Sequence, residues 1–149
     1  MKRGTQLLIV DDNAATRYAL RRRLERHHYR VLEAGTDQEG LDLIASGKID
    51  ALVLDVNLPD MSGFDIVRRL RADPATALLP VVHVSAASIQ TGDIITCLDA
   101  GADAYLIPPI DPDVFLATLR TVFRAHDTRY ALRDRVARLS ELLFNIRPP

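Results

Sequence analysis

Apolar runs of strand length recur five times along the chain, and each is followed by a segment with helical spacing or a helix-capping signal. Alternating strands and helices are typical of a parallel sheet covered on both faces, and nearly continuous apolar strands such as ALVL fit burial on both sides. The pattern therefore predicts an α/β fold with a doubly wound, five-stranded parallel sheet in the order 2-1-3-4-5. The five predicted strands are Leu7 to Val10, Tyr29 to Leu32, Ala51 to Leu54, Val81 to Val84 and Ala104 to Ile107.

Capping residues mark the ends of several predicted helices. Residue types that commonly cap helix N-termini stand at three positions, and we expect a helix to begin just after each: Thr36, Ser62 and Asp111. Gly47 and Gly101 stand where helices are expected to end. These signals divide the chain into alternating units without a long linker.

The composition indicates one ordinary globular domain without a strong excess of positive or negative charge. The chain has 149 residues, of which 48% are hydrophobic and 26% charged, with a formal net charge of -1. Such a balance argues against bulk attraction to nucleic acid or to a membrane. The single cysteine, Cys97, excludes an internal disulfide, and no stretch approaches membrane-spanning length, so we expect a cytoplasmic location.

Polar side chains follow the predicted strands where each strand ends. Asp11 and Asp12 come after the first strand, Asp55 after the third and Ser85 after the fourth. In the predicted order the first and third strands are neighbours, so the three carboxylates converge on the crevice where the winding reverses. Each aspartate alone also fits a turn or a helix cap. Together they predict a site for a hard divalent cation, Mg²⁺ foremost, because unneutralised carboxylates would repel one another.

The segments LLIVDDN, LVLDVNLPDMSGFD, HVSA and GADAYLIPP resemble the receiver domain of two-component response regulators, across about Leu7 to Phe123. The resemblance implies that Asp55 accepts a phosphoryl group from a phosphohistidine on a histidine kinase or phosphotransfer protein. It also implies that Asp11, Asp12, Asp55 and the backbone carbonyl of Asn57 hold Mg²⁺. A metal offsets the charge of both the carboxylate nucleophile and the incoming group.

Two further residues take roles from the resemblance alone. Ser85 matches the hydroxyl residue that hydrogen-bonds the attached phosphoryl group, and Tyr105 matches the aromatic switch residue that turns inward as the hydroxyl residue moves. Each has a structural alternative: Ser85 satisfies backbone groups at a strand end, and Tyr105 packs on the sheet.

Pro108 is a departure from the family pattern. It stands before Pro109, where the pattern has a lysine before a proline, and a cis Pro108-Pro109 bond would keep the loop shape without the charge. Losing this cation weakens the stabilisation of an anionic phosphoryl group. Two hypotheses follow: the domain is still phosphorylated, which the retained motif residues favour, or it is a phosphorylation-independent pseudo-receiver acting as a dimerisation or interaction module.

The helical pattern that begins at Pro112 continues past the expected end of a receiver. We therefore predict a receiver domain over residues 1–124 and a helical extension over 125–149, a coiled coil or a linker to an output domain. Valine and leucine recur at alternate seam positions, which favours a parallel homodimer, whereas the alternative is a helix folded back on its own domain. About twenty-five residues cannot hold a winged helix, so direct nucleic-acid binding is not expected. The seven-residue repeat is Val122, Ala125, Arg129, Leu132, Val136, Leu139, Leu143 and Ile146.

Enzymatic readings are weaker. A Mg²⁺-dependent hydrolase with Asp55 as nucleophile would carry a second aspartate two residues on, and that position is Asn57. A nucleotide-binding enzyme is disfavoured because the chain has neither GxGxxG nor GK[ST]. We expect a phosphoacceptor signalling domain, not an enzyme, although small phosphodonors would serve it in autophosphorylation.

Overall fold

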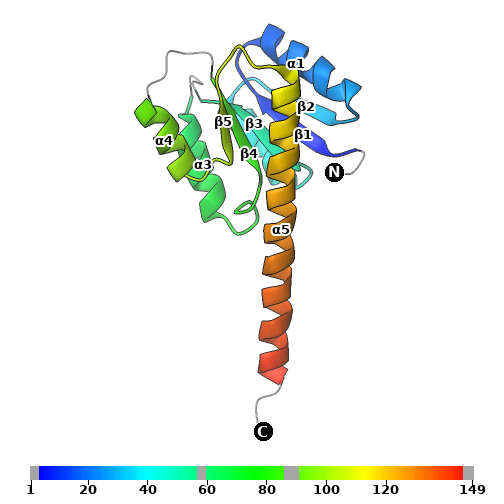
Figure 1. Cartoon of the computed structure of the whole chain (residues 1–149). Helices are drawn as coiled ribbons and strands as arrows, with labels where there is room; N and C mark the ends of the chain where they lie inside the picture. Colours follow the sequence, from blue (N-terminus) through cyan, green and yellow to red (C-terminus); the bar gives the residue numbers. More distant parts are fainter. Residues whose placement is uncertain (1–3, 57–59, 86–90, 146–149) are drawn as a thin grey trace.

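A computed structural model describes residues 4–56, 60–85 and 91–145 of the chain. Strands and helices alternate throughout, as the apolar pattern predicts (Figure 1). The strands are β1 (Gln6–Val10), β2 (Arg30–Ala34), β3 (Ala51–Asp55), β4 (Val81–Val84) and β5 (Ala104–Leu106). The helices are α1 (Ala14–Arg26), α2 (Asp37–Ala45), α3 (Gly63–Ala72), α4 (Thr91–Asp99) and α5 (Pro112–Asn145).

All strand pairs are parallel, and the order β2-β1-β3-β4-β5 confirms the predicted topology. β1 is central to the reversal of winding, because it pairs with β2 on one edge and with β3 on the other. The register aligns Val10 with Leu54 across β1 and β3. The residues directly after these two positions therefore emerge side by side at one edge of the sheet.

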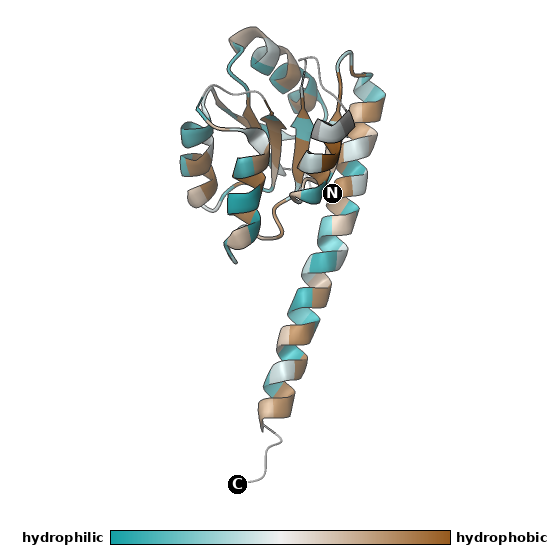
Figure 2. Ribbon diagram, turned by 90° about the vertical axis from the view of Figure 1, so that its left-hand side faces the viewer, coloured by the Kyte–Doolittle hydropathy of each residue, from teal (hydrophilic) through white to brown (hydrophobic). Residues whose placement is uncertain are grey.

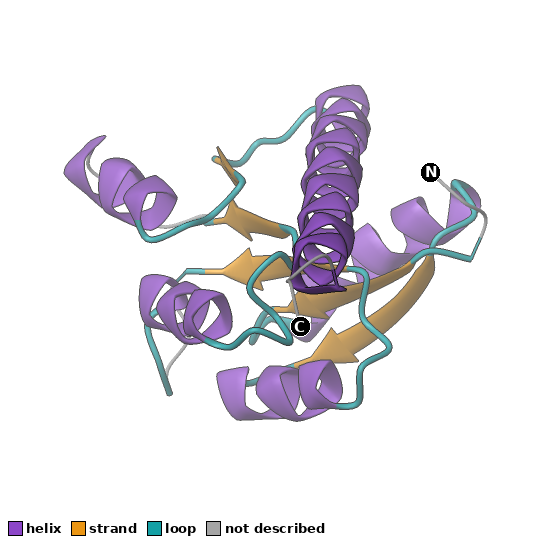
Figure 3. Ribbon diagram, turned by 90° about the horizontal axis from the view of Figure 1, so that it is seen from below, coloured by secondary structure: helices purple, strands orange, loops and turns teal. Residues whose placement is uncertain are grey.

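Two apolar cores lie on opposite faces of the sheet, with helices on both sides (Figure 3). Strand residues alternate between them: Leu7 and Ile9 pack with residues of α1 and α5, whereas Leu8 and Val10 pack with residues of α2 and α3. This alternation explains why the strands are apolar at nearly every position. Cys97 is buried on α4.

Four of the five predicted strands differ at a boundary. β1 begins one residue earlier, at Gln6, and β3 runs one residue further, to Asp55. β2 runs two residues beyond Leu32, because the charged Glu33 is tolerated in the strand by ion pairs with Arg17 and Arg21 on α1. Tyr29 precedes the strand and stacks on Phe123 of α5, with ring centroids 6.5 Å apart. β5 ends one residue early, before the half-exposed Ile107.

The predicted caps are confirmed. Thr36 and Ser62 accept N–H hydrogen bonds from the third residue of their helices, at 3.1 and 3.4 Å, and Asp111 accepts one from Asp113 at 2.8 Å. Gly47 and Gly101 have positive φ values of 77° and 116°, a backbone conformation that favours glycine.

The long helix α5 belongs to the domain only in its first part. Its buried residues up to Phe123 lie in the core beneath the sheet, and His126 Nδ1 contacts the Leu78 carbonyl oxygen at 2.8 Å. Arg129 still pairs with Asp103 at 2.9 Å, and beyond it the helix projects away from the sheet rather than folding back on it (Figure 1). Within the described ranges, no helix has the length and apolar character needed to cross a membrane.

Candidate functional site

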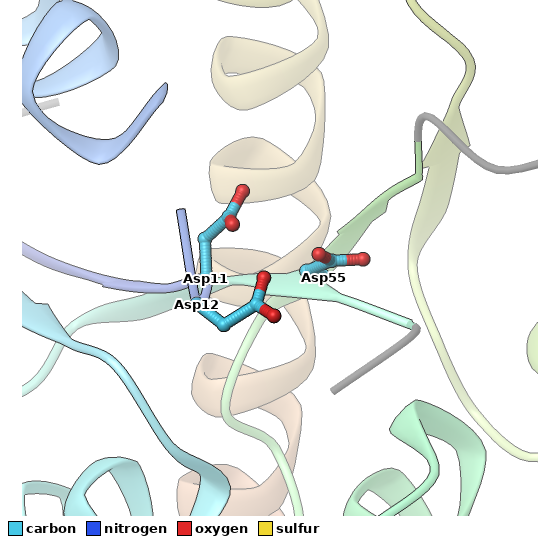
Figure 4. Close-up of side chains that lie close together, drawn as sticks. All are labelled: Asp11, Asp12 and Asp55. Atoms are coloured by element: carbon cyan, nitrogen blue, oxygen red, sulfur yellow. The ribbon is translucent and has the colours of Figure 1, made fainter. Parts of the chain in front are cut away.

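Three aspartates meet where β1 and β3 end. Asp11, Asp12 and Asp55 each offer a carboxylate oxygen, and these oxygens lie within 4.8 Å of one another. Asp12 is exposed and the other two are half-buried, so the cluster is open on one side. Figure 4 shows the three side chains gathered at this edge of the sheet. The structure thus brings together the three carboxylates that the strand order predicts.

The cap of α1 and the edge of the sheet hold Asp11 in place. The Asn13 backbone N–H donates to Asp11 Oδ1 at 2.8 Å, while the Asn13 side chain accepts the Thr16 N–H at 3.0 Å. The Asp11 backbone N–H donates to the Ala34 carbonyl of β2 at 3.1 Å. Sheet and helix cap together leave the side chain of Asp11 little freedom.

The groups around Asp11 raise its pKa above the ordinary value for an aspartate. Burial raises the pKa of Asp11, the Asn13 N–H lowers it, and the charge of Asp12 raises it again. Arg17 also lowers this pKa: its Nη1 donates to the Asp11 carbonyl oxygen, and its Nε pairs with Glu33 at 3.3 Å. Sequence reasoning missed Arg17, because nothing in the sequence indicates that a mid-helix arginine reaches back to the end of β1.

The donor set fits Mg²⁺. Three carboxylates with an open side suit a hard divalent ion that keeps several of its waters. Within the described ranges, no other group of three or more histidine, cysteine, aspartate or glutamate side chains is arranged to hold a metal. The fourth predicted ligand, Asn57, lies outside the described residues.

Ser85 and Tyr105 lie on the strands beyond Asp55. Val84 is the register partner of Asp55, so Ser85 follows one residue further along β4; it is 1% exposed and its N–H donates to the Leu106 carbonyl at 3.3 Å. Tyr105 is the register partner of His83, and their rings lie 6.0 Å apart at a tilt of 51°. Ser85 therefore follows the strand next to β3, and Tyr105 lies on β5, one strand further out.

Pro108 contributes an apolar surface where the family pattern has a cation. The Pro108-Pro109 bond is cis. Pro108 borders a groove of about 500 Å³ between α1 and the start of α5, together with side chains such as Ala15, Ala19 and Ile110. Among the described residues the one lysine, Lys48, follows α2 and is exposed, so no described ammonium group takes the place of the missing lysine.

Sequence reasoning also missed Asp37 and Asp60, which meet at the N-terminus of α2. Asp37 is 1% exposed although it occupies the first turn of a helix, where an aspartate normally faces water and complements the helix dipole. Asp60 contacts this first turn by accepting the backbone N–H groups of Asp37 and Gln38. No local sequence signal predicts that contact.

Fold and site together define a class of protein: a doubly wound α/β domain with an acidic cluster where the winding of the sheet reverses. The family described as the response regulator receiver domain matches residues 7–120, so the chain belongs to this family. Its place is therefore in two-component signalling.

Similar proteins agree with this assignment. The chain is 37% identical over 139 residues to the response regulator MprA of Mycobacterium tuberculosis, covering 93% of this chain and 59% of that protein. It is 42% identical over 127 residues to the KDP operon transcriptional regulatory protein KdpE of Escherichia coli, covering 85% and 55%. The chain thus spans little more than half the length of these relatives.

A solved structure supports the fold directly. The receiver domain protein of Methanospirillum hungatei superposes with a TM-score of 0.77 at 26% identity, covering 85% of this chain and 98% of that one.

Proposed function

We propose that Asp55 is the phosphoacceptor of this receiver domain, and that a phosphohistidine on a histidine kinase or phosphotransfer protein is the donor. A carboxylate oxygen of Asp55 would attack phosphorus, forming an O–P bond as the N–P bond of the phosphohistidine breaks. The leaving imidazole nitrogen keeps the electron pair and takes up a proton. The observation that carries this proposal is the convergence of Asp11, Asp12 and Asp55 at the switch point.

The surrounding residues support the same chemistry. Asp11, Asp12, Asp55 and the Asn57 backbone carbonyl would hold Mg²⁺, which supplies charge neutralisation for the nucleophile and the phosphoryl oxygens. Ser85 would hydrogen-bond the phosphoryl group after transfer, and Tyr105 would act as the aromatic switch residue. Ser85 is supported by its place one residue beyond the register partner of Asp55.

Pro108 distinguishes this domain from the family pattern. Without a lysine ammonium, the phosphorylated state relies more on the cation held by the acidic cluster, so Pro108 would tune its formation and lifetime. The competing proposal is a pseudo-receiver that signals by contact alone. The intact acidic cluster favours phosphorylation, because a scaffold has no need of three repelling carboxylates.

Intact mass spectrometry after incubation with Mg²⁺ and acetyl phosphate tests the proposal. The wild type is expected to gain one phosphoryl group, and Asp55→Ala is expected to gain none. Asp65→Ala is the matched control, because Asp65 is an exposed carboxylate on the neighbouring helix α3. Pro108→Lys is expected to increase the fraction phosphorylated, because it adds a cation that can stabilise the anionic group.

Two results would contradict the proposal in different ways. Uptake by Pro108→Lys but not by the wild type would identify a pseudo-receiver whose chemistry the proline has removed. An adduct that persists in Asp55→Ala would place the phosphoacceptor elsewhere.

We further propose that α5 passes the state of the domain to its output. The relatives are regulators nearly twice as long as the aligned region, and KdpE is a transcriptional regulatory protein, so a fused or separate output domain is one recipient. The other is a second copy of this chain, paired through the exposed side chains of the helical extension. Leu132, Val136, Leu139 and Leu143 are each more than half exposed on the projecting helix.

A further inference from the structure

Asp60 fastens the N-terminus of α2 to the loop after β3. Its two carboxylate oxygens accept the backbone N–H groups of Asp37 and Gln38, at 3.2 and 3.1 Å. N–H groups in the first turn of a helix have no partner within the helix, and they favour a negative charge nearby. Asp60 therefore acts as a cap that comes from another segment of the chain.

Asp37, the residue next to this cap, has an unusual environment for a carboxyl group. Its side chain is 1% exposed, and neither oxygen accepts a hydrogen bond within the described part of the chain. The charged groups that act on it are Asp60 from the loop and Asp55 from β3, and both are negative. An ionised Asp37 would be desolvated and repelled by both neighbours, with no compensating donor.

A bound cation would neutralise Asp37, but the surroundings do not suit one. Both oxygens of Asp60 already accept backbone N–H groups, and a divalent ion requires about six oxygen ligands. In the described ranges the only metal-type cluster is the Asp11, Asp12 and Asp55 group. A proton needs no further ligands and fits between two adjacent carboxyl groups.

We propose that Asp37 is protonated in the folded protein and donates its O–H to the carboxylate of Asp60, so that one shared proton ties α2 to the loop after β3. This pairing satisfies the buried carboxyl group and leaves Asp60 the negative charge that caps α2. It requires neither Mg²⁺ nor phosphorylation of Asp55.

The direction of the pKa shift agrees with the geometry. The pKa of Asp37 is raised from 3.8 to about 7; burial is the largest cause and the charge of Asp60 the next. Because the folded pKa lies above the unfolded one, the folded state binds the proton more tightly. The stabilisation is complete below pH 3.8, and it is lost progressively as pH rises through about 7.

Replacing Asp37 by Asn tests the proposal, because an amide is neutral at every pH and still donates an N–H to Asp60. We would measure urea unfolding of the wild type and Asp37→Asn at about pH 5 and about pH 8, and compare the difference between the two proteins. The unfolding equilibrium constant of the wild type relative to the variant is expected to rise on the order of a hundredfold across this range. Because the wild type and the variant share all other titrating groups, the effects of those groups cancel when the two unfolding free energies are compared at the same pH.

Asp42→Asn is the matched control, since Asp42 is an exposed aspartate on the same helix. Its difference from the wild type is expected to change far less with pH. A pH-independent difference for Asp37→Asn would overturn the proposal.

A second measurement decides the matter if Asp37→Asn does not fold. The carboxyl carbon of Asp37 in the wild type, followed by ¹³C nuclear magnetic resonance, is expected to titrate near pH 7, and a midpoint near 3.8 would overturn the proposal. Both measurements use the protein without a phosphodonor, so their failure would leave the role proposed for Asp55 untouched.

Discussion

At the scale of single residues, His83 shows how a polar side chain is accommodated in the centre of the sheet. Its side chain is fully buried, and its Nδ1 lies 3.4 Å from the Leu54 carbonyl oxygen of β3. Burial lowers the pKa of His83 from 6.5 to about 4, because a charged imidazolium would be desolvated there. The contact with Leu54 opposes this shift without reversing it. His83 is therefore neutral in the folded protein at physiological pH.

This environment predicts a loss of stability in acid. Since the folded pKa lies below the unfolded one, the contribution of His83 is complete above pH 6.5 and is lost as pH falls toward 4. We expect the wild type to lose about 2 kcal/mol relative to His83→Gln between pH 7 and pH 5, measured by urea unfolding. A constant difference between the two proteins would show that His83 does not titrate as its burial requires.

His83 and Asp37 affect stability in opposite directions over the same range. The first loses stability as pH falls below 6.5, and the second loses it as pH rises from 3.8 to about 7. Between about pH 4 and pH 6.5, their opposite contributions to the change of unfolding free energy with pH largely cancel in the wild type. A wild-type stability that changes little with pH is therefore consistent with the titration of both groups. Only the single variants at His83 and Asp37 separate their contributions.

At the scale of elements, Asp103 connects several segments at the end of the sheet opposite the acidic cluster. One of its oxygens accepts the Val81 N–H at 2.8 Å and pairs with Arg71 of α3 at 3.1 Å; the other pairs with Arg129 of α5 at 2.9 Å. Arg71 is largely buried and also donates to the Gly101 and Leu79 carbonyls. Asp103 is thus the shared counter-ion of α3 and α5.

Removing Asp103 should cost far more stability than removing its exposed partner. Asp103→Ala leaves the Arg71 guanidinium, whose side chain is only 21% exposed, without its counter-ion, and we expect a loss of about 3 kcal/mol in urea unfolding. Arg129 is 45% exposed, and Arg129→Ala is expected to cost about 1 kcal/mol or less. Equal losses in the two variants would show that Asp103 does not act through Arg71.

The elements that sequence predicts well are those whose signals are local. The spacing of apolar residues predicted the five strands, and the capping residues predicted the helix starts at Thr36 and Ser62. The alternation of strands and helices predicted the strand order, which brings Asp11 and Asp55 together. The unpredicted features depend on contacts between distant segments. Glu33 extends β2 because α1 supplies arginines, and Asp60, from a distant segment, caps α2 beside the buried Asp37.

At the scale of the whole molecule, α5 carries an apolar surface that its own domain does not cover. Figure 2 shows hydrophobic residues interspersed along the projecting half of the helix. The seam residue Arg129 is held by Asp103 of the same chain, so the free seam begins at Leu132. A second copy is the occupant we propose, because the spacing of three and four residues is that of a coiled coil. A contiguous apolar surface of this kind is expected to be covered by a partner.

Dimerisation through this seam predicts that Val136→Glu weakens self-association. Each Val136 is 60% exposed in a single chain and would be buried against its copy, so a carboxylate there loses its water without gaining a partner. We expect the dissociation constant from sedimentation equilibrium to rise at least about tenfold, equivalent to about 1.4 kcal/mol. Ala137→Glu is the matched control, because it adds the same charge one residue away, off the seam. If both variants associate like the wild type, or if the wild type is monomeric at every concentration, α5 does not pair with a second copy and an output domain remains as its partner.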